Sequence, residues 1–207
     1  YSGNIHSPFR LRTNSGKLYI TDYYIGHGGV YVYNPSAGEK VTNIFTSSNT
    51  IPATGIAFTG SGSSRKLYAF DGAATSMGAA SNVLKVKRYD IGTSDSWTAA
   101  SASAQFNAVS ALLINGNVEI IPSEKGVFVS QQRNSNSNTE DVPSIAHITS
   151  DGTITFNSGK DLPSLKGNYG CGMALYNNKV FATVNGSGNI EIYHITFSGN
   201  TPKFTYQ

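Results

Sequence analysis

The amino-acid sequence predicts an all-β protein built from four similar sheets. A short apolar strand pattern recurs four times, at residues 18–21, 67–70, 127–130 and 180–183, and its starts lie 49, 60 and 53 residues apart. No stretch keeps a helical period of 3.6 residues, because glycine, asparagine, serine and β-branched residues interrupt the pattern. A spacing of roughly fifty residues suits a unit of about four short strands.

Each repeat divides into an inner strand, the recurring strand, a third strand and an outer strand, with turn residues between them. The first repeat gives strands at 9–11, 18–21, 30–33 and 41–45, with a turn at Asn14, Ser15 and Gly16. In the second repeat the strands are 55–58, 67–70, 84–89 and a weak outer strand near Trp97.

The last two repeats follow the same plan. The third gives strands at 118–121, 127–130, 145–149 and 153–156, and the fourth at 173–175, 180–184, 190–195 and 203–206. The ends of the third strands also align, at residues 33–34, 89–90, 148–149 and 195–196. The recurring strand and the end of the third strand therefore appear together in every repeat.

Such units are expected to stack around a common axis as the blades of a β-propeller. A lone four-stranded sheet leaves an apolar face bare, and radial stacking covers that face and protects the sheet edges. We expect one domain over residues 1–207, with repeats at about 7–51, 52–107, 108–163 and 164–207. Four repeats form either a closed four-bladed disc or the greater part of a larger ring.

The first repeat also resembles a known class of propeller repeat. Residues 17–22, a glycine-containing loop, residues 29–35 and Gly38 are similar to one NHL or YVTN repeat. The second repeat keeps this pattern at 67–71 and 86–90, whereas Gln131 and Val184 replace the strand-end aspartate in the last two. The resemblance implies a propeller used for recognition or scaffolding more often than for catalysis.

The composition limits the partners and the setting. Only 13% of the residues are charged, against roughly 25% in average soluble domains, while serine, threonine and asparagine make up 63 of the 207 residues. This favours an extracellular, cell-surface or periplasmic protein. Lysine and arginine are scattered, which argues against nucleic acid as a partner. No apolar run reaches the eighteen residues of a membrane span.

Loops that follow the recurring strand are expected to gather on one face of a propeller, where a rigid frame positions them for binding. The first loop offers Asp22, Tyr23, Tyr24 and His27 among glycines, a mixture that suits a sugar or a peptide. The other loops add further candidate ligand-binding residues to this face: Asp71, Arg133, Glu140, Asp141 and Asn185.

Metal and catalytic patterns are incomplete. The loop from Asn134 alternates oxygen side chains as calcium loops do, but Thr139 and Ile145 stand where glycine and an acidic residue are needed. His147 and His194 occupy similar places in the third strands and are interpreted as packing residues. Cys171 is interpreted as a small buried residue. We therefore assign no catalytic residue, no metal and no cofactor.

Three functional hypotheses remain. The first is a non-catalytic secreted or cell-surface module that binds a glycan or a protein through its loop face. The second is a propeller hydrolase, a lactonase or glycosidase, in which Asp22, Asp71 and Glu140 or Asp141 serve as acid and base near the axis. The third is a structural scaffold of a surface assembly.

Overall fold

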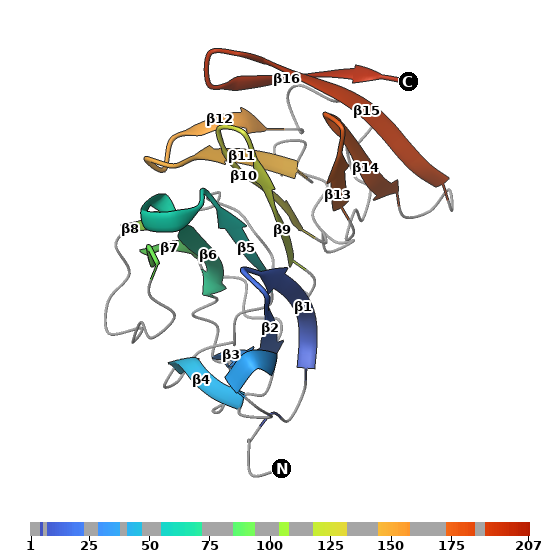
Figure 1. The fold of residues 1–207 in the computed structure, drawn as a ribbon. Helices are drawn as coiled ribbons and strands as arrows, with labels where there is room; N and C mark the ends of the chain where they lie inside the picture. Colours follow the sequence, from blue (N-terminus) through green and yellow to red (C-terminus); the bar gives the residue numbers. More distant parts are fainter. Residues whose placement is uncertain are drawn as a thin grey trace.

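The computed structural model is all-β (Figure 1). It describes residues 5, 8–22, 29–37, 41–46, 55–71, 85–93, 104–107, 118–131, 145–157, 173–184 and 189–207. Within this described part, sixteen strands form four antiparallel sheets, and each sheet contains four strands in sequence order. The repeated four-stranded unit predicted from the sequence is therefore confirmed.

Each sheet corresponds to one predicted repeat. Sheet 1 contains β1 (Pro8–Asn14), β2 (Lys17–Asp22), β3 (Gly29–Tyr33) and β4 (Val41–Thr46). Sheet 2 contains β5 (Ile56–Thr59), β6 (Lys66–Asp71), β7 (Lys85–Asp90) and β8 (Ala104–Asn107). Short 3₁₀ turns follow β3 and β5, at Pro35–Ala37 and Gly62–Ser64.

Sheets 3 and 4 repeat the arrangement. Sheet 3 contains β9 (Val118–Ser123), β10 (Gly126–Gln131), β11 (Ile145–Thr149) and β12 (Ile154–Asn157). Sheet 4 contains β13 (Met173–Tyr176), β14 (Lys179–Val184), β15 (Asn189–Ser198) and β16 (Thr201–Tyr206). The recurring strand is the second strand of every sheet.

One strand prediction needs correction. The outer strand of the second repeat was expected near Trp97, but the strand that pairs with β7 is Ala104–Asn107, with Phe106 opposite Val86 in the register. Trp97 itself lies outside the described residues. The register with β7 decides which segment becomes the outer strand, and a single tryptophan gave no information about that pairing.

Alternation along the second strands builds the core between neighbouring sheets. Tyr19 is buried in a cluster with sheet 2, and its ring centroid lies 4.4 Å from that of Phe58. Leu67 faces back into the same cluster, whereas Tyr68 lines the boundary with sheet 3. Phe128 faces forward to sheet 4 in the same way, and Val180 faces back. The second residue of the pattern thus contacts the next sheet, and the first contacts the preceding one.

The sheets follow one another along an open arc, with sheet 1 at one end and sheet 4 at the other (Figure 1). The first strands β1, β5, β9 and β13 pack in that order along the inner edge. The described strands of the two end sheets do not pack against each other, so the chain does not form the closed four-bladed disc. Membership of a larger ring stays a prediction.

Candidate functional site

A cleft of about 390 Å³ lies between sheet 2 and sheet 3, on the side where each first strand turns into its second. Its lining is formed mainly by groups that donate or accept hydrogen bonds. Sheet 2 supplies Thr59, Gly60, Ser64, Lys66 and Tyr68. Residues 123–126 and 149–151 of sheet 3 form the opposite wall, and Asn200 adds an amide from the β15–β16 turn.

The sheet 2 wall depends on a tight turn between β5 and β6. Gly60 has a φ of +68°, and a Cβ at this position would lie 2.5 Å from the carbonyl oxygen of Ser64. The Ser64 hydroxyl donates a hydrogen bond to the carbonyl of Ser61 at 2.8 Å, which closes the turn. Glycine at position 60 is therefore required for this turn, which leads into Lys66 at the start of β6.

Tyr68 forms the buried floor of the cleft. Its side chain is fully buried, and no described group gives its hydroxyl a well-aligned hydrogen bond. Burial raises the pKa of Tyr68, while the nearby Thr59 hydroxyl acts in the opposite direction. The phenol beneath the cleft is therefore neutral at pH 7.

The sheet 3 wall is a hydrogen-bonded turn between β11 and β12. The Thr149 hydroxyl donates to the carboxylate of Asp151, and the Thr153 backbone N–H donates to the same oxygen at 3.2 Å. These hydrogen bonds lower the pKa of the exposed Asp151 side chain. A carboxylate acceptor is thus held in place at the rim of the cleft.

One contact between the two walls and one close approach within the sheet 3 wall shape the cleft. Arg88 of β7 donates to the backbone carbonyl of Ser150 and also pairs with Asp90, with Nε and Oδ1 3.2 Å apart. Gly126 begins β10 with a φ of +150°, and a Cβ there would collide with the carbonyl of Ile148. The absent side chain lets β10 approach β11 closely at the wall.

A buried histidine lies behind the sheet 3 wall. The ring nitrogens of His147 contact the hydroxyls of Ser123 at 2.9 Å and Thr155 at 2.7 Å. Its ring centroid lies 4.8 Å from that of Phe128 and 5.4 Å from that of Phe197. Burial lowers the pKa of His147 to about 4, so the ring is neutral at pH 7.

His147 is a packing residue, as the sequence predicted, but His194 does not occupy the equivalent place. His147 pairs with Phe128 in the register, whereas the residue opposite the corresponding Phe181 is Ile192. His194 instead lies opposite Lys179 and is half-buried. The offset arises because β15 is longer than β11, which the sequence alignment of the strand ends did not reveal.

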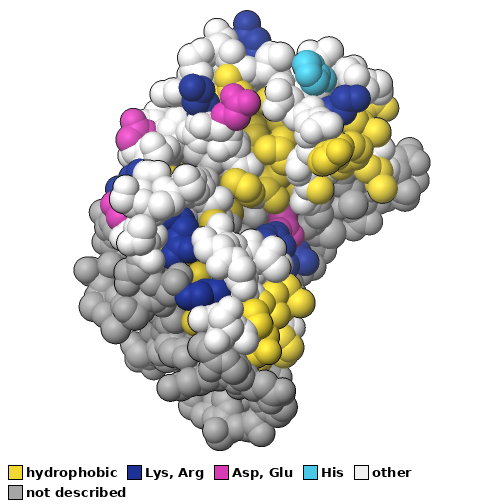
Figure 2. All heavy atoms as spheres, in the orientation of Figure 1, with side chains coloured by type: hydrophobic (Ala, Val, Ile, Leu, Met, Phe, Trp, Pro, Cys, Tyr) yellow, Lys and Arg dark blue, Asp and Glu magenta, His cyan; other side chains and the backbone are white. Residues whose placement is uncertain are grey.

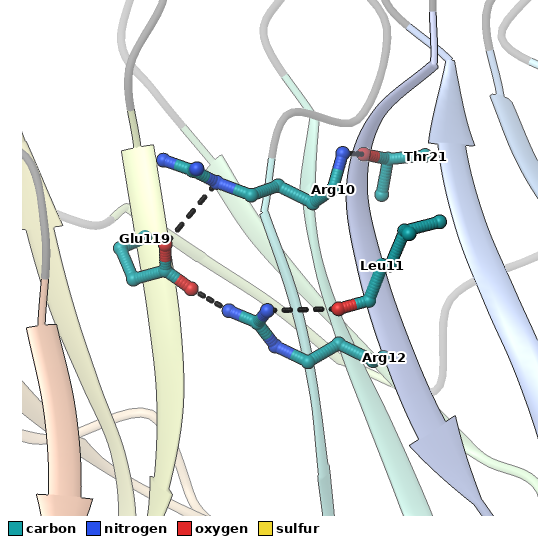
Figure 3. Close-up of polar contacts among 5 residues, drawn as sticks. All are labelled: Arg10, Leu11, Arg12, Thr21 and Glu119. Atoms are coloured by element: carbon teal, nitrogen blue, oxygen red, sulfur yellow. Dashed lines mark hydrogen bonds and ion pairs between the residues drawn. The ribbon is translucent and has the colours of Figure 1, made fainter.

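The inner edge of the arc carries a charged cluster of Arg10, Arg12 and Glu119 (Figure 3). Arg10 and Arg12 come from β1, and Glu119 reaches them from β9; Arg10 Nε lies 3.1 Å from Glu119 Oε2. The Glu119 side chain is only 7% exposed. Burial and the charge of Arg10 both lower the pKa of Arg12. Two guanidinium groups thus pair with this carboxylate, which suits a structural tie between sheets 1 and 3 better than a general acid.

Of the candidate residues from the sequence, Asp22 has a described side chain. It ends β2, is fully buried and does not line the cleft. Burial raises the pKa of Tyr31, and the charge of Asp22 adds to this shift. Asp71 ends β6 opposite Lys85 in the register. The remaining predicted residues lie outside the described part of the chain: Tyr23, Tyr24, His27, Arg133, Glu140, Asp141 and Asn185. The loop-face hypothesis stays a prediction.

Sequence reasoning missed the cleft because its walls come from two different repeats. Lys66 stands directly before a recurring strand, and Asp151 with Gly152 has the composition of a turn, so both looked like ordinary connections. Glu119 gave a clearer signal, as a charged residue inside the apolar run 118–121.

Within the described residues, no group of three or more histidine, cysteine, aspartate or glutamate side chains is placed to hold a metal ion. No helix among them is long and apolar enough to cross a bilayer. No protein-family model matches the chain, and no curated protein matches it at a significant level.

Proposed function

We propose that the chain is a non-catalytic glycan-binding module of the β-propeller type, and that it binds a neutral saccharide in the cleft between sheets 2 and 3. The observation that carries the proposal is the lining of the cleft, which is rich in hydroxyl, amide and charged groups. Its volume of about 390 Å³ falls in the range of small-molecule sites.

The distribution of charge favours a neutral ligand. Lys66 and Lys125 supply cationic donors, and Glu124 and Asp151 supply carboxylate acceptors in the same cleft. Because the two signs balance, neither an acidic nor a basic ligand is preferred. A saccharide hydroxyl both donates and accepts hydrogen bonds, so it can pair with both kinds of group.

The hydrolase hypothesis receives less support. A glycosidase needs two carboxyl groups about 5–10 Å apart with different protonation states. Glu119 is engaged by two arginines, and Asp151 is fixed as an acceptor with a lowered pKa. The surface composition supports an extracellular, cell-surface or periplasmic setting for glycan recognition.

The test is a glycan array that includes neutral and acidic saccharides, followed by calorimetric titration of the tightest neutral hit. We expect Lys66→Met to weaken binding about tenfold, as expected for the loss of one charged hydrogen bond. Lys203→Met, on exposed β16 away from the cleft, is the matched control and should bind as the parent does. The proposal is contradicted if the protein binds no neutral saccharide on the array, or if both variants lose the same affinity.

A further inference from the structure

The hairpin formed by β15 and β16 extends beyond the sheet to which it belongs. β15 contains ten residues, whereas the third strands β3, β7 and β11 contain five or six. Its pairing with β14 ends at His194, and the four residues that follow, through Ser198, pair with β16. At the usual rise of a strand, these four residues carry the turn about 13 Å beyond the last pair with β14.

The tip of this hairpin lies at the cleft between sheets 2 and 3. Figure 1 shows the hairpin beside β12, and β12 and β16 are in contact. Asn200, in the two-residue turn between Ser198 and Thr201, lines the cleft although it belongs to sheet 4. The cleft therefore has a third side, which comes from a segment far along the chain from the other two.

Aromatic packing fixes the base of the hairpin. The ring centroid of Phe204 lies 5.7 Å from that of Phe128, and the ring centroid of Phe197 lies 5.4 Å from that of His147. A ring nitrogen of His147 in turn contacts the hydroxyl of Ser123 at 2.9 Å, and Ser123 lines the cleft. The turn and the sheet 3 wall thus share one packed support, which lowers the entropy cost of binding a ligand between them.

The side-chain amide of Asn200 is free to bind a ligand. Asn200 is exposed at the turn, and its amide has no hydrogen-bond partner among the residues that the structure describes. An amide donates hydrogen bonds from its nitrogen and accepts them at its oxygen. Two neighbouring hydroxyl groups of a sugar can pair with both atoms when their orientations suit the plane of the amide. Such a contact distinguishes sugars that differ in the orientation of one hydroxyl.

The charged side chains of the cleft are less suited to this discrimination. Figure 2 shows side chains of both charge signs along this side of sheets 2 and 3. Lys66 and Lys125 carry point charges on long, flexible stems, so each ammonium group can follow a hydroxyl into several orientations. Asn200 has a short side chain and a planar end, and therefore accepts fewer arrangements of hydroxyl groups.

We propose that Asn200 is a specificity-determining residue of the cleft, and that its amide binds two neighbouring hydroxyl groups of a neutral hexose. This inference rests on the proposed function and adds the residue that selects the sugar. The lysines and carboxylates of sheets 2 and 3 supply affinity, and the turn of sheet 4 supplies the choice among epimers.

The probes for the test are the methyl glycosides of glucose, galactose and mannose, titrated by NMR. Glucose differs from each of the other two sugars in the orientation of one hydroxyl group. We expect the parent chain to prefer one glycoside by at least about fivefold, and Asn200→Ala to reduce this preference below about twofold, as for the loss of neutral hydrogen bonds. Gln207→Ala is the matched control, because it removes an exposed side-chain amide outside the cleft, directly after β16, and should keep the preference.

Backbone amide signals in the same titration separate this inference from the proposed function. We expect the preferred glycoside to shift the signals of Asn200 and Thr201 together with those of Lys66 and Ser123. Shifts confined to sheets 2 and 3, equal affinity of the parent chain for all three glycosides, or a preference that survives in Asn200→Ala would overturn the role of Asn200 and leave the cleft as a saccharide site. No shift at any of these residues would contradict both proposals.

Discussion

The junction between sheets 3 and 4 and the junction between sheets 2 and 3 join sheets of the same topology but differ in chemistry. The first is closed by Phe128, Phe197, Phe204 and aliphatic side chains around them. The second opens at its rim into a cleft lined by hydroxyl and charged groups. The repeated frame fixes where neighbouring sheets meet, while the side chains at each junction decide whether it is closed by apolar packing or opens into a polar cleft.

The largest expected effect comes from emptying the aromatic junction. Phe128 is fully buried, with ring centroids of Phe204 and Phe197 at 5.7 Å and 6.4 Å. Phe128→Ala should lower the free energy of unfolding by about 4 kcal/mol, because it removes buried apolar surface and leaves a cavity. Urea denaturation measures this change.

Ile154→Ala is a suitable control in the same sheet, because Ile154 is 41% exposed and should cost less than about 1 kcal/mol. If the two variants were equally stable, the aromatic junction would not be the main source of stability, and the contrast between the two junctions would fail.

The sequence predicted the strands of this frame far better than the cleft. Period-two alternation is a local property, so the strands around Leu18, Leu67, Val127 and Val180 could be found from a few residues each. The cleft depends on contacts between distant residues. Arg88 reaches the carbonyl of Ser150, 62 positions away, and no local pattern encodes that pairing.

The same limit applies to the charged cluster of Arg10, Arg12 and Glu119, because its members lie far apart in the sequence. Arg10 and Arg12 share one face of β1 by alternation, which the sequence does indicate, but their partner Glu119 lies more than a hundred residues later. Likewise, the sequence predicted repeating sheets correctly and left the closure of the ring open, because closure depends on the angle between sheets and not on the pattern within one.

The second-largest expected effect is a loss of stability at acid pH, caused by His147, which packs against Phe128 of the aromatic junction. His147 has a pKa of about 4 when folded and an ordinary value of 6.5 when unfolded. Above pH 6.5 both states are neutral, so stability is complete. Between pH 6.5 and about 4 the unfolded chain binds the extra proton, so stability falls, by on the order of 3 kcal/mol in total.

His147→Gln should remove this slope, because an amide can contact the hydroxyls of Ser123 and Thr155 without titrating. His194→Gln is the matched control, because it makes the same change opposite Lys179 in sheet 4 and leaves His147 with its contacts to Ser123 and Thr155 in place. The measurement is the free energy of unfolding by urea from pH 4 to pH 8. A slope that persists in His147→Gln would assign the acid effect to another group.

The smallest expected effect comes from the ion pairs of Glu119 with Arg10 and Arg12, at the inner edge beside the junction between sheets 2 and 3. Glu119 links sheet 3 to Arg10 and Arg12 of sheet 1, past the inner strand of sheet 2. Glu119→Gln keeps the shape of the side chain but leaves two guanidinium groups facing each other without a counter-charge. We expect a loss of about 2 kcal/mol, less than for a fully buried pair because both arginines are partly exposed. Asp90→Asn removes one partner of the exposed Arg88 pair and should cost under about 1 kcal/mol.

Hydrogen exchange should then show faster opening of β9 in Glu119→Gln with little change in β14, because the aromatic junction holds β14 independently. Equal acceleration in both strands would mean that the two junctions unfold as one unit.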